Sequence, residues 1–231
     1  MSSVRQKWVA VLRDYGGNFA EVGWSLGHSG VGRVRNRVTS EADWEKNQER
    51  NVRRARSRIR RKVLAAGFDR LLTLTQRETV TDVSEYHERL RKFIRLCQKR
   101  GYLRQYVGVF EYQKRGSLHV HLAIRGWVPV QVLRTLARRA GFDNVDISYR
   151  RHRGTRLSRL RIARYLAKYL SKDTVRTVGG HRYLSSKGIV VPEVRVECPS
   201  VAAVLSLLPR VGYVWVLPEA EGSLGWACSW G

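Results

Sequence analysis

The chain has 231 residues, enough for one well-packed core or for a core with an appended module. Its 44 Lys and Arg against 19 Asp and Glu leave a formal charge of +25, which favours a polyanionic partner such as nucleic acid. The N-terminus lacks an apolar signal core, no run approaches ~18 uncharged apolar residues, and the scattered cysteines suit no disulfide framework, so we expect a soluble cytoplasmic protein without membrane contact.

Residues 1 to about 40 are rich in glycine and basic residues without a hydrophobic period, and we expect an irregular arm. From Glu41 to Ala66, apolar residues at helical spacing predict a helix. Eight of the 13 residues from 50 to 62 are Lys or Arg, with no acid among them. Such a cluster is either a solvated face or a phosphate-binding one, and we favour DNA contact because uncompensated like charges repel one another. The contacting residues would be Arg53, Arg54, Arg58 and Arg61.

The central part of the chain alternates β-like and helical patterns. Helices are expected at 82–101 and 129–141, and strands at 70–75, 106–113, 118–125 and 144–150. This βαββαβ order predicts an α+β fold of the ferredoxin-like, split βαβ type, with helices on one face of an antiparallel sheet and the other face free for a site. A further helix is expected at 158–172. Beyond it lie β-like runs at 188–196 and 212–217, separated by a short helical piece, to which the sequence assigns no role.

Two histidines stand in an alternating strand pattern. His119 and His121 belong to the run Leu118–Ile124, so both imidazoles leave one face while the aliphatic residues enter the core. Two polar rings placed together cost free energy unless a ligand or hydrogen bond engages them. The pair therefore indicates a site on this face of the sheet.

Glu111, on the preceding strand, shares the histidine face if the hairpin loop has an odd length. The tighter odd loop sets it opposite His121, and the longer one, closed by Gln113 and Ser117, opposite His119; an even loop turns it away. Two imidazoles and one carboxylate suit Mg²⁺ or Mn²⁺, with zinc as the alternative metal.

Two tyrosines and two lysines share the last predicted helix. Tyr165 and Tyr169 are i,i+4 neighbours, and so are Lys168 and Lys172. Tyrosines at this spacing are more often packing residues than nucleophiles, but here other residues form the apolar stripe and the phenols lie beside the lysines. A phenol and a divalent ion are the parts that covalent cleavage of a phosphodiester needs. The approach to this helix is basic and includes Arg161 and Arg164.

Three ordered segments, Leu72–Thr75, the paired histidines and Ile162–Lys172, resemble the motifs of HUH rolling-circle replication initiators. The Rep proteins of small phages and plasmids, including the gene II proteins of filamentous phages, are most similar, over about residues 50–195. The resemblance implies a nickase that opens one strand at an origin through a 5′-phosphotyrosyl intermediate, initiating and terminating replication. It also implies His119 and His121 as metal ligands, Glu111 as the third, and Lys172 or Lys168 at the phosphate.

The resemblance also suggests how the tyrosines share the work. In single-tyrosine plasmid Reps, a glutamate stands four residues before the nucleophile, where this chain has Tyr165. We therefore assign the first cleavage to Tyr169 and the terminating transfer to Tyr165. Thr73 and Thr75 of the first motif are expected to contact DNA.

The resemblance divides the chain into a basic arm and helix (1–66), an HUH endonuclease domain (67–196) and a C-terminal tail packed on that domain (197–231). The expected partners are single-stranded or hairpin origin DNA in a bacterial host, with a host helicase and polymerase. No G-x-x-x-x-G-K-[ST] loop is present, so no nucleotide cofactor is expected. An HUH transposase or relaxase, and a non-enzymatic basic protein whose His and Tyr residues only pack, are the alternatives.

Overall fold

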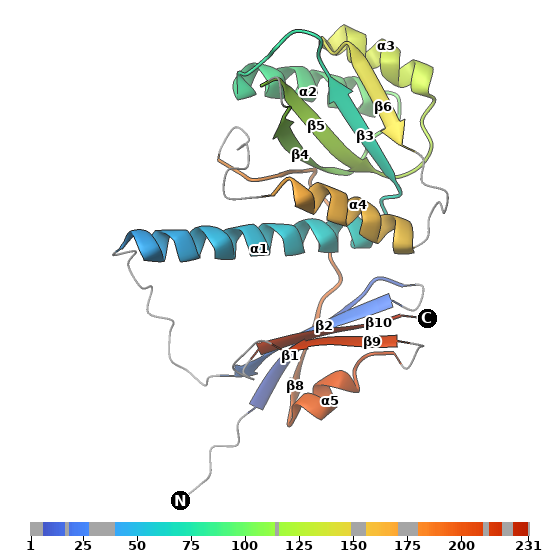
Figure 1. Ribbon diagram of the computed structural model, residues 1–231. Helices are drawn as coiled ribbons and strands as arrows, with labels where there is room; N and C mark the ends of the chain where they lie inside the picture. Colours follow the sequence, from blue (N-terminus) through green and yellow to red (C-terminus); the bar gives the residue numbers. More distant parts are fainter. Residues whose placement is uncertain are drawn as a thin grey trace, which may run out of the picture. The chain divides into compact units, whose positions relative to one another are not determined.

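The computed structural model describes residues 7–16, 19–27, 40–113, 116–148, 156–170, 180–209, 213–218 and 224–230. The chain divides into two compact units, one of residues 38–190 and one that joins residues 1–37 to residues 191–231 (Figure 1). Within the described ranges, no helix combines the length and the apolar character needed to cross a membrane.

The larger unit is built on an antiparallel sheet. Its strands lie in the order β6-β3-β5-β4-β7, and each neighbouring pair is antiparallel. Helix α2 (Val83–Gln98) connects β3 to β4, and α3 (Val130–Ala140) connects β5 to β6, which confirms the predicted α+β, split βαβ arrangement. The strands are β3 (Arg70–Thr75), β4 (Tyr106–Tyr112), β5 (Leu118–Ile124), β6 (Asn144–Ser148) and β7 (Leu184–Ser185).

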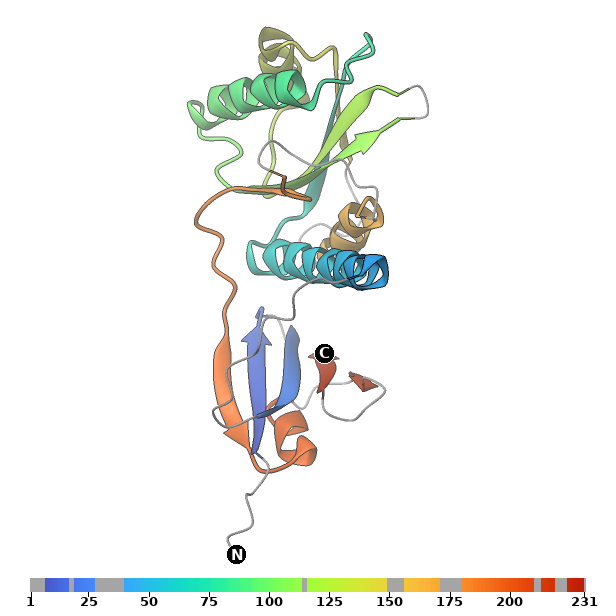
Figure 2. The same ribbon diagram turned by 90° about the vertical axis from the view of Figure 1, so that its left-hand side faces the viewer.

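Helices α2 and α3 cover one face of this sheet (Figures 1 and 2). Their apolar stripes pack on strand residues of alternating position, such as Leu72 and Val120. Tyr86 of α2 lies edge-on to Phe110 with ring centroids 5.7 Å apart, and its hydroxyl donates to the Leu74 carbonyl at 2.9 Å. This core occupies the side of the sheet opposite to the histidines.

Helices α1 (Glu41–Ala65) and α4 (Arg156–Lys168) pack together on the other face. The Ser40 side chain caps α1 by accepting a hydrogen bond from the Asp43 amide at 3.1 Å. The predicted stripe of α1 is buried against α4 and against the strand residues Val107 and Ala123. The expectation that this face stays free is therefore wrong, because two amphipathic helices bury their apolar sides on it.

The smaller unit contains a second antiparallel sheet and a short helix, α5 (Val201–Leu205). The strand order is β8-β1-β2-β10-β9. The strands are β1 (Lys7–Asp14), β2 (Phe19–Gly27), β8 (Val194–Cys198), β9 (Tyr213–Pro218) and β10 (Leu224–Trp230).

This second sheet corrects the expected division of the chain. Residues 7–14 and 19–27 are paired strands, not an irregular arm, and the strands within 197–231 belong to the same sheet, not to a tail. Trp8, Ala10 and Leu12 pack with α5 as a period-two stripe along β1. The predicted β-like runs at 188–196 and 212–217 and the short helix between them correspond to β8, β9 and α5. Their membership of one sheet with β1 and β2 was not predicted, because pairing between the two ends of a chain leaves no local signal.

Candidate active site

The paired histidines lie in the middle of the larger sheet, on the face that α4 covers. His119 and His121 project to one side of β5, and both are buried, with 8% and 4% of their surface exposed. The β4–β5 register sets Glu111 opposite His119, and the β3–β5 register sets Thr73 opposite His121. Three neighbouring strands thus bring four polar side chains to one patch of the sheet.

The hairpin between β4 and β5 decides the position of Glu111. The Gln113 amide donates to the Ser117 carbonyl oxygen at 2.9 Å and closes the loop. This is the longer of the two odd-length loops that the sequence allowed, and it places Glu111 opposite His119. The prediction that the carboxylate shares the histidine face is confirmed.

His121 is held through both ring nitrogens. The Thr73 hydroxyl oxygen lies 3.0 Å from Nδ1, and Oε2 of Glu111 lies 2.9 Å from Nε2. A partner on one nitrogen fixes the orientation of the ring and leaves the other nitrogen directed at the site. Burial lowers the pKa of His121, and the hydrogen bond to Glu111, which raises it, does not compensate. The lowered pKa favours the neutral imidazole, the form that binds a metal.

Both tyrosines meet this imidazole. The Tyr169 ring stacks on His121 with centroids 4.8 Å apart and planes 12° from parallel. The Tyr165 ring lies edge-on to His121 at 5.3 Å and to Tyr169 at 5.2 Å. Side chains from β5 and from the end of α4, far apart in the sequence, thus form one cluster of aromatic rings.

The environment of the Tyr169 phenol favours its neutral form. Burial is the main reason why the pKa of Tyr169 is raised, and the nearby Tyr165 and Glu111 raise it further. Lys168 Nζ lies 5.7 Å from the centre of the Tyr169 ring. Lys172, the other predicted lysine, lies outside the described residues. The phenol therefore requires added positive charge in its surroundings before it can act as a nucleophile at neutral pH.

The helix that carries Tyr165 ends earlier than the sequence suggested. α4 stops at Lys168, whereas the prediction extended it to Lys172. The amides of Tyr169 and Leu170 bond three residues back, at 3.2 and 3.1 Å, which tightens the last turn. Arg56 of α1 then donates from Nε at 3.0 Å and from Nη2 at 2.6 Å to the Leu170 carbonyl. The Leu170 carbonyl oxygen thus accepts its hydrogen bonds from Arg56 and does not need a further helical turn to supply a donor.

The other predicted DNA-binding residues lie on two helices and a strand. Arg53, Arg54 and Arg58 are exposed on α1, whereas Arg61 is half-buried. Arg161 and Arg164 are exposed on α4, and Thr75 lies on the same side of β3 as Thr73. The predicted DNA-binding arginines thus lie on α1 and α4, the helices that cover the histidine face, and none of them is part of the histidine cluster.

Two residues with a place near the site were not selected from the sequence. Asp146 of β6 is exposed and lies opposite Thr73 in the pairing of β6 with β3, so it shares the histidine face. The alternation of the predicted 144–150 strand carried this signal. Arg56 was one cation among eight, and nothing in the pattern distinguished it.

The imidazoles of His119 and His121 and the carboxylate of Glu111 are side chains of the kinds that bind divalent ions. His121 Nε2 and Glu111 Oε2 lie 2.9 Å apart. Neighbouring ligands of an octahedral ion with bonds of ~2.1 Å are separated by ~3 Å, so this pair has the required spacing. Within the described part of the chain, no group of three or more His, Cys, Asp or Glu side chains is arranged to hold an ion. The His119 ring, centred 6.3 Å from that of His121, would have to turn to join the pair.

Residues 69–174 match the model of a family of replication-associated proteins, described as the ORF2 and gene II protein type. The match spans the βαββαβ order, the paired histidines and both tyrosines. It confirms the resemblance to phage- and plasmid-type rolling-circle replication initiators and associates the chain with DNA replication. The searches of curated proteins and of solved structures gave no match.

Proposed function

We propose that this chain, a replication-associated protein over its matched residues, nicks one strand of an origin and rejoins it through a phosphotyrosyl intermediate. The observation that carries the proposal is the stacking of Tyr169 on His121, with centroids 4.8 Å apart. This contact supports the proposal because Tyr169, the proposed nucleophile, lies directly beside a residue proposed to hold a metal. A phosphate held there would lie within reach of a phenol without movement of the sheet.

In the proposed reaction, the Tyr169 hydroxyl oxygen forms a bond to phosphorus and the bond to the 3′ oxygen breaks. The phenol gives its proton to solvent, and the departing 3′ oxygen takes one up, so the reaction consumes neither water nor nucleotide. The free 3′-hydroxyl then primes synthesis. Reversal by a 3′-hydroxyl restores the phosphodiester and releases the tyrosine.

His119, His121 and Glu111 would hold Mg²⁺ or Mn²⁺, which when bound supplies positive charge to the oxygens of the scissile phosphate. Thr73 keeps the His121 ring in place through Nδ1 at 3.0 Å. Lys168, whose Nζ is 5.7 Å from the Tyr169 ring centre, supplies charge on the side of the phenol. These contributions offset the burial that favours the neutral phenol.

The two tyrosines have different positions relative to His121. Tyr169 stacks on the imidazole, and Tyr165 presents its edge at 5.3 Å. This difference supports the assignment of the first cleavage to Tyr169 and of the terminating transfer to Tyr165. Origin DNA in single-stranded or hairpin form would be the substrate. A host helicase would open the duplex and a host polymerase would extend the 3′ end.

The test is a denaturing gel that detects a covalent protein–DNA band after incubation with single-stranded origin DNA and Mn²⁺. Tyr169→Phe should abolish the band, whereas Tyr165→Phe should retain it but release fewer closed circles in a termination assay. Tyr106→Phe is the control, because Tyr106 packs against the opposite face of the sheet. If the band persists in Tyr169→Phe and disappears in Tyr165→Phe, the two roles are reversed. DNA binding without any band in the wild type would support the non-enzymatic alternative.

A further inference from the structure

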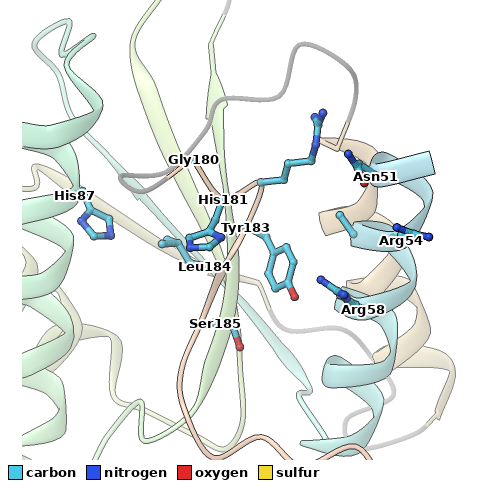
Figure 3. Close-up of a pocket in the computed structure, with 11 residues that line it drawn as sticks. Asn51, Arg54, Arg58, His87, Gly180, His181, Tyr183, Leu184 and Ser185 are labelled. Atoms are coloured by element: carbon cyan, nitrogen blue, oxygen red, sulfur yellow. The ribbon is translucent and has the colours of Figure 1, made fainter. Parts of the chain in front are cut away.

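The larger unit contains a cavity of about 530 Å³ that shares no residue with the histidine and tyrosine cluster. Its walls are α1, residues 180–185 and His87 of α2. Figure 3 shows Asn51, Arg54 and Arg58 on one side, His87 on the other, and the segment of residues 180–185 between them. A volume of this size accommodates a ligand of nucleotide dimensions.

The lining of the cavity is positively charged. Arg54, Arg58 and Arg182 contribute guanidinium groups, and the described residues that line the cavity include no Asp or Glu. In the described part of the chain, neither Arg54 nor Arg58 forms an ion pair with a carboxylate. Arg58 also lowers the pKa of Lys62, after the larger effect of burial. The charge of α1 is thus uncompensated where it meets the cavity, a condition that favours an anion.

An aromatic ring stands in the same cavity. Tyr183 is half-buried, and its ring points toward α1 in Figure 3. Lys62 Nζ lies 5.9 Å from the ring centre and donates to the Ser185 hydroxyl at 2.7 Å. Because Ser185 belongs to β7, which pairs with β4, residues 183–185 are attached to the main sheet. The ring is therefore held on a fixed support beside the arginines.

We propose that this cavity binds one nucleotide of a single-stranded DNA, with the base against Tyr183 and the phosphate at Arg54 and Arg58. Single-strand binding proteins combine aromatic platforms for bases with positive charge for the backbone. The Arg182 guanidinium, buried and hydrogen-bonded to Gln48, forms part of the wall that joins residues 180–185 to α1. The proposal rests on the proposed function only in its choice of DNA as ligand, and it requires no cleavage.

The experiment measures binding of the full chain to an oligothymidine of ~16 nucleotides, the upper end of single-strand site sizes, by fluorescence anisotropy in EDTA. An abasic oligonucleotide of equal length provides the same phosphates without bases. Tyr183→Leu should weaken oligothymidine binding by about 5- to 150-fold, the effect of losing one stacking ring, and should leave abasic binding unchanged. Tyr183→Phe keeps the ring and should bind like the wild type. Circular dichroism would verify that both variants fold.

A second pair of variants tests the phosphate contact. Arg54→Gln should weaken binding more than Arg53→Gln, because both side chains are exposed on α1 but only Arg54 lines the cavity. Equal effects in this pair, or oligothymidine binding by Tyr183→Leu equal to that of the wild type, would overturn the proposal. Displacement of the oligothymidine by an equal concentration of free thymidine monophosphate would also overturn it, since the ligand would then be a free nucleotide. Because EDTA excludes cleavage, failure here leaves the nicking proposal standing.

Discussion

Replacing Arg56 by methionine would test whether α1 positions Tyr169, the proposed nucleophile. Arg56 donates to the Leu170 carbonyl from Nε at 3.0 Å and from Nη2 at 2.6 Å, and Leu170 itself is fully buried. Hydrogen bonds from a charged group contribute ~1.5–3 kcal/mol, and we expect a loss of unfolding free energy near ~1.5 kcal/mol because part of the arginine is exposed to water. Methionine keeps most of the aliphatic side chain, so packing against α4 is little changed.

The catalytic effect should exceed what this loss of stability explains. Leu170 follows Tyr169 directly, so release of its carbonyl frees the end of α4 that holds the phenol over His121. A misplacement of ~1 Å at a reacting group can cost ~100-fold in rate, and we expect a decrease of ~10- to 100-fold in adduct formation.

Two measurements would be compared between Arg56→Met and Arg53→Met, which removes an equal charge from α1. Urea denaturation gives the unfolding free energy, and single-turnover adduct formation at saturating DNA gives the rate. Both variants should lose DNA affinity to a similar extent, while only Arg56→Met should lose rate. The reasoning is refuted if the two variants match in urea midpoint and in adduct rate.

Three further results are expected. His121→Ala should abolish the adduct in Mn²⁺ and spare most of the DNA affinity measured in EDTA; a nicking rate equal to that of the wild type would exclude the metal assignment. Neutralising four α1 arginines should flatten the salt dependence of single-strand binding by ~0.7 in log–log slope for each phosphate that is no longer neutralised. The four are Arg53, Arg54, Arg58 and Arg61, and an unchanged slope would show that this face points away from DNA. Gly108→Ala should lower the unfolding free energy measured in urea by ~1–3 kcal/mol, because the new Cβ would lie 2.8 Å from the His121 carbonyl oxygen; unaltered stability would contradict the β4–β5 packing.

Local patterns in the sequence were sufficient to locate most helices and strands of the larger unit. Alternation located β3 to β6, and helical spacing located α1 to α3. Hairpin parity gave Glu111 two positions beside the histidines for an odd loop, and an even loop would have turned it away. These features depend on periods of two and 3.6 residues and on turn residues, which neighbouring positions encode. The same patterns predicted the polar face of β5 without knowledge of its partners.

Features that depend on distant segments were not predictable in this way. The second sheet pairs β1 with β8 across most of the chain, and no local period indicates such a partner. The end of α4 depends on Arg56, which is 114 residues away from the carbonyl that it bonds. The cavity beside Tyr183 requires α1, α2 and β7 to meet, although each segment by itself is ordinary.

By itself, the sequence determined the secondary structure of the matched region and the types of side chain available to the site, because periodicity and residue chemistry are local properties. Only the tertiary structure decided that Glu111 faces His119, that Tyr169 stacks on His121, and that α1 and α4 cover the face expected to be open. These outcomes follow from burial of apolar stripes and from strand register, which depend on the whole packed unit.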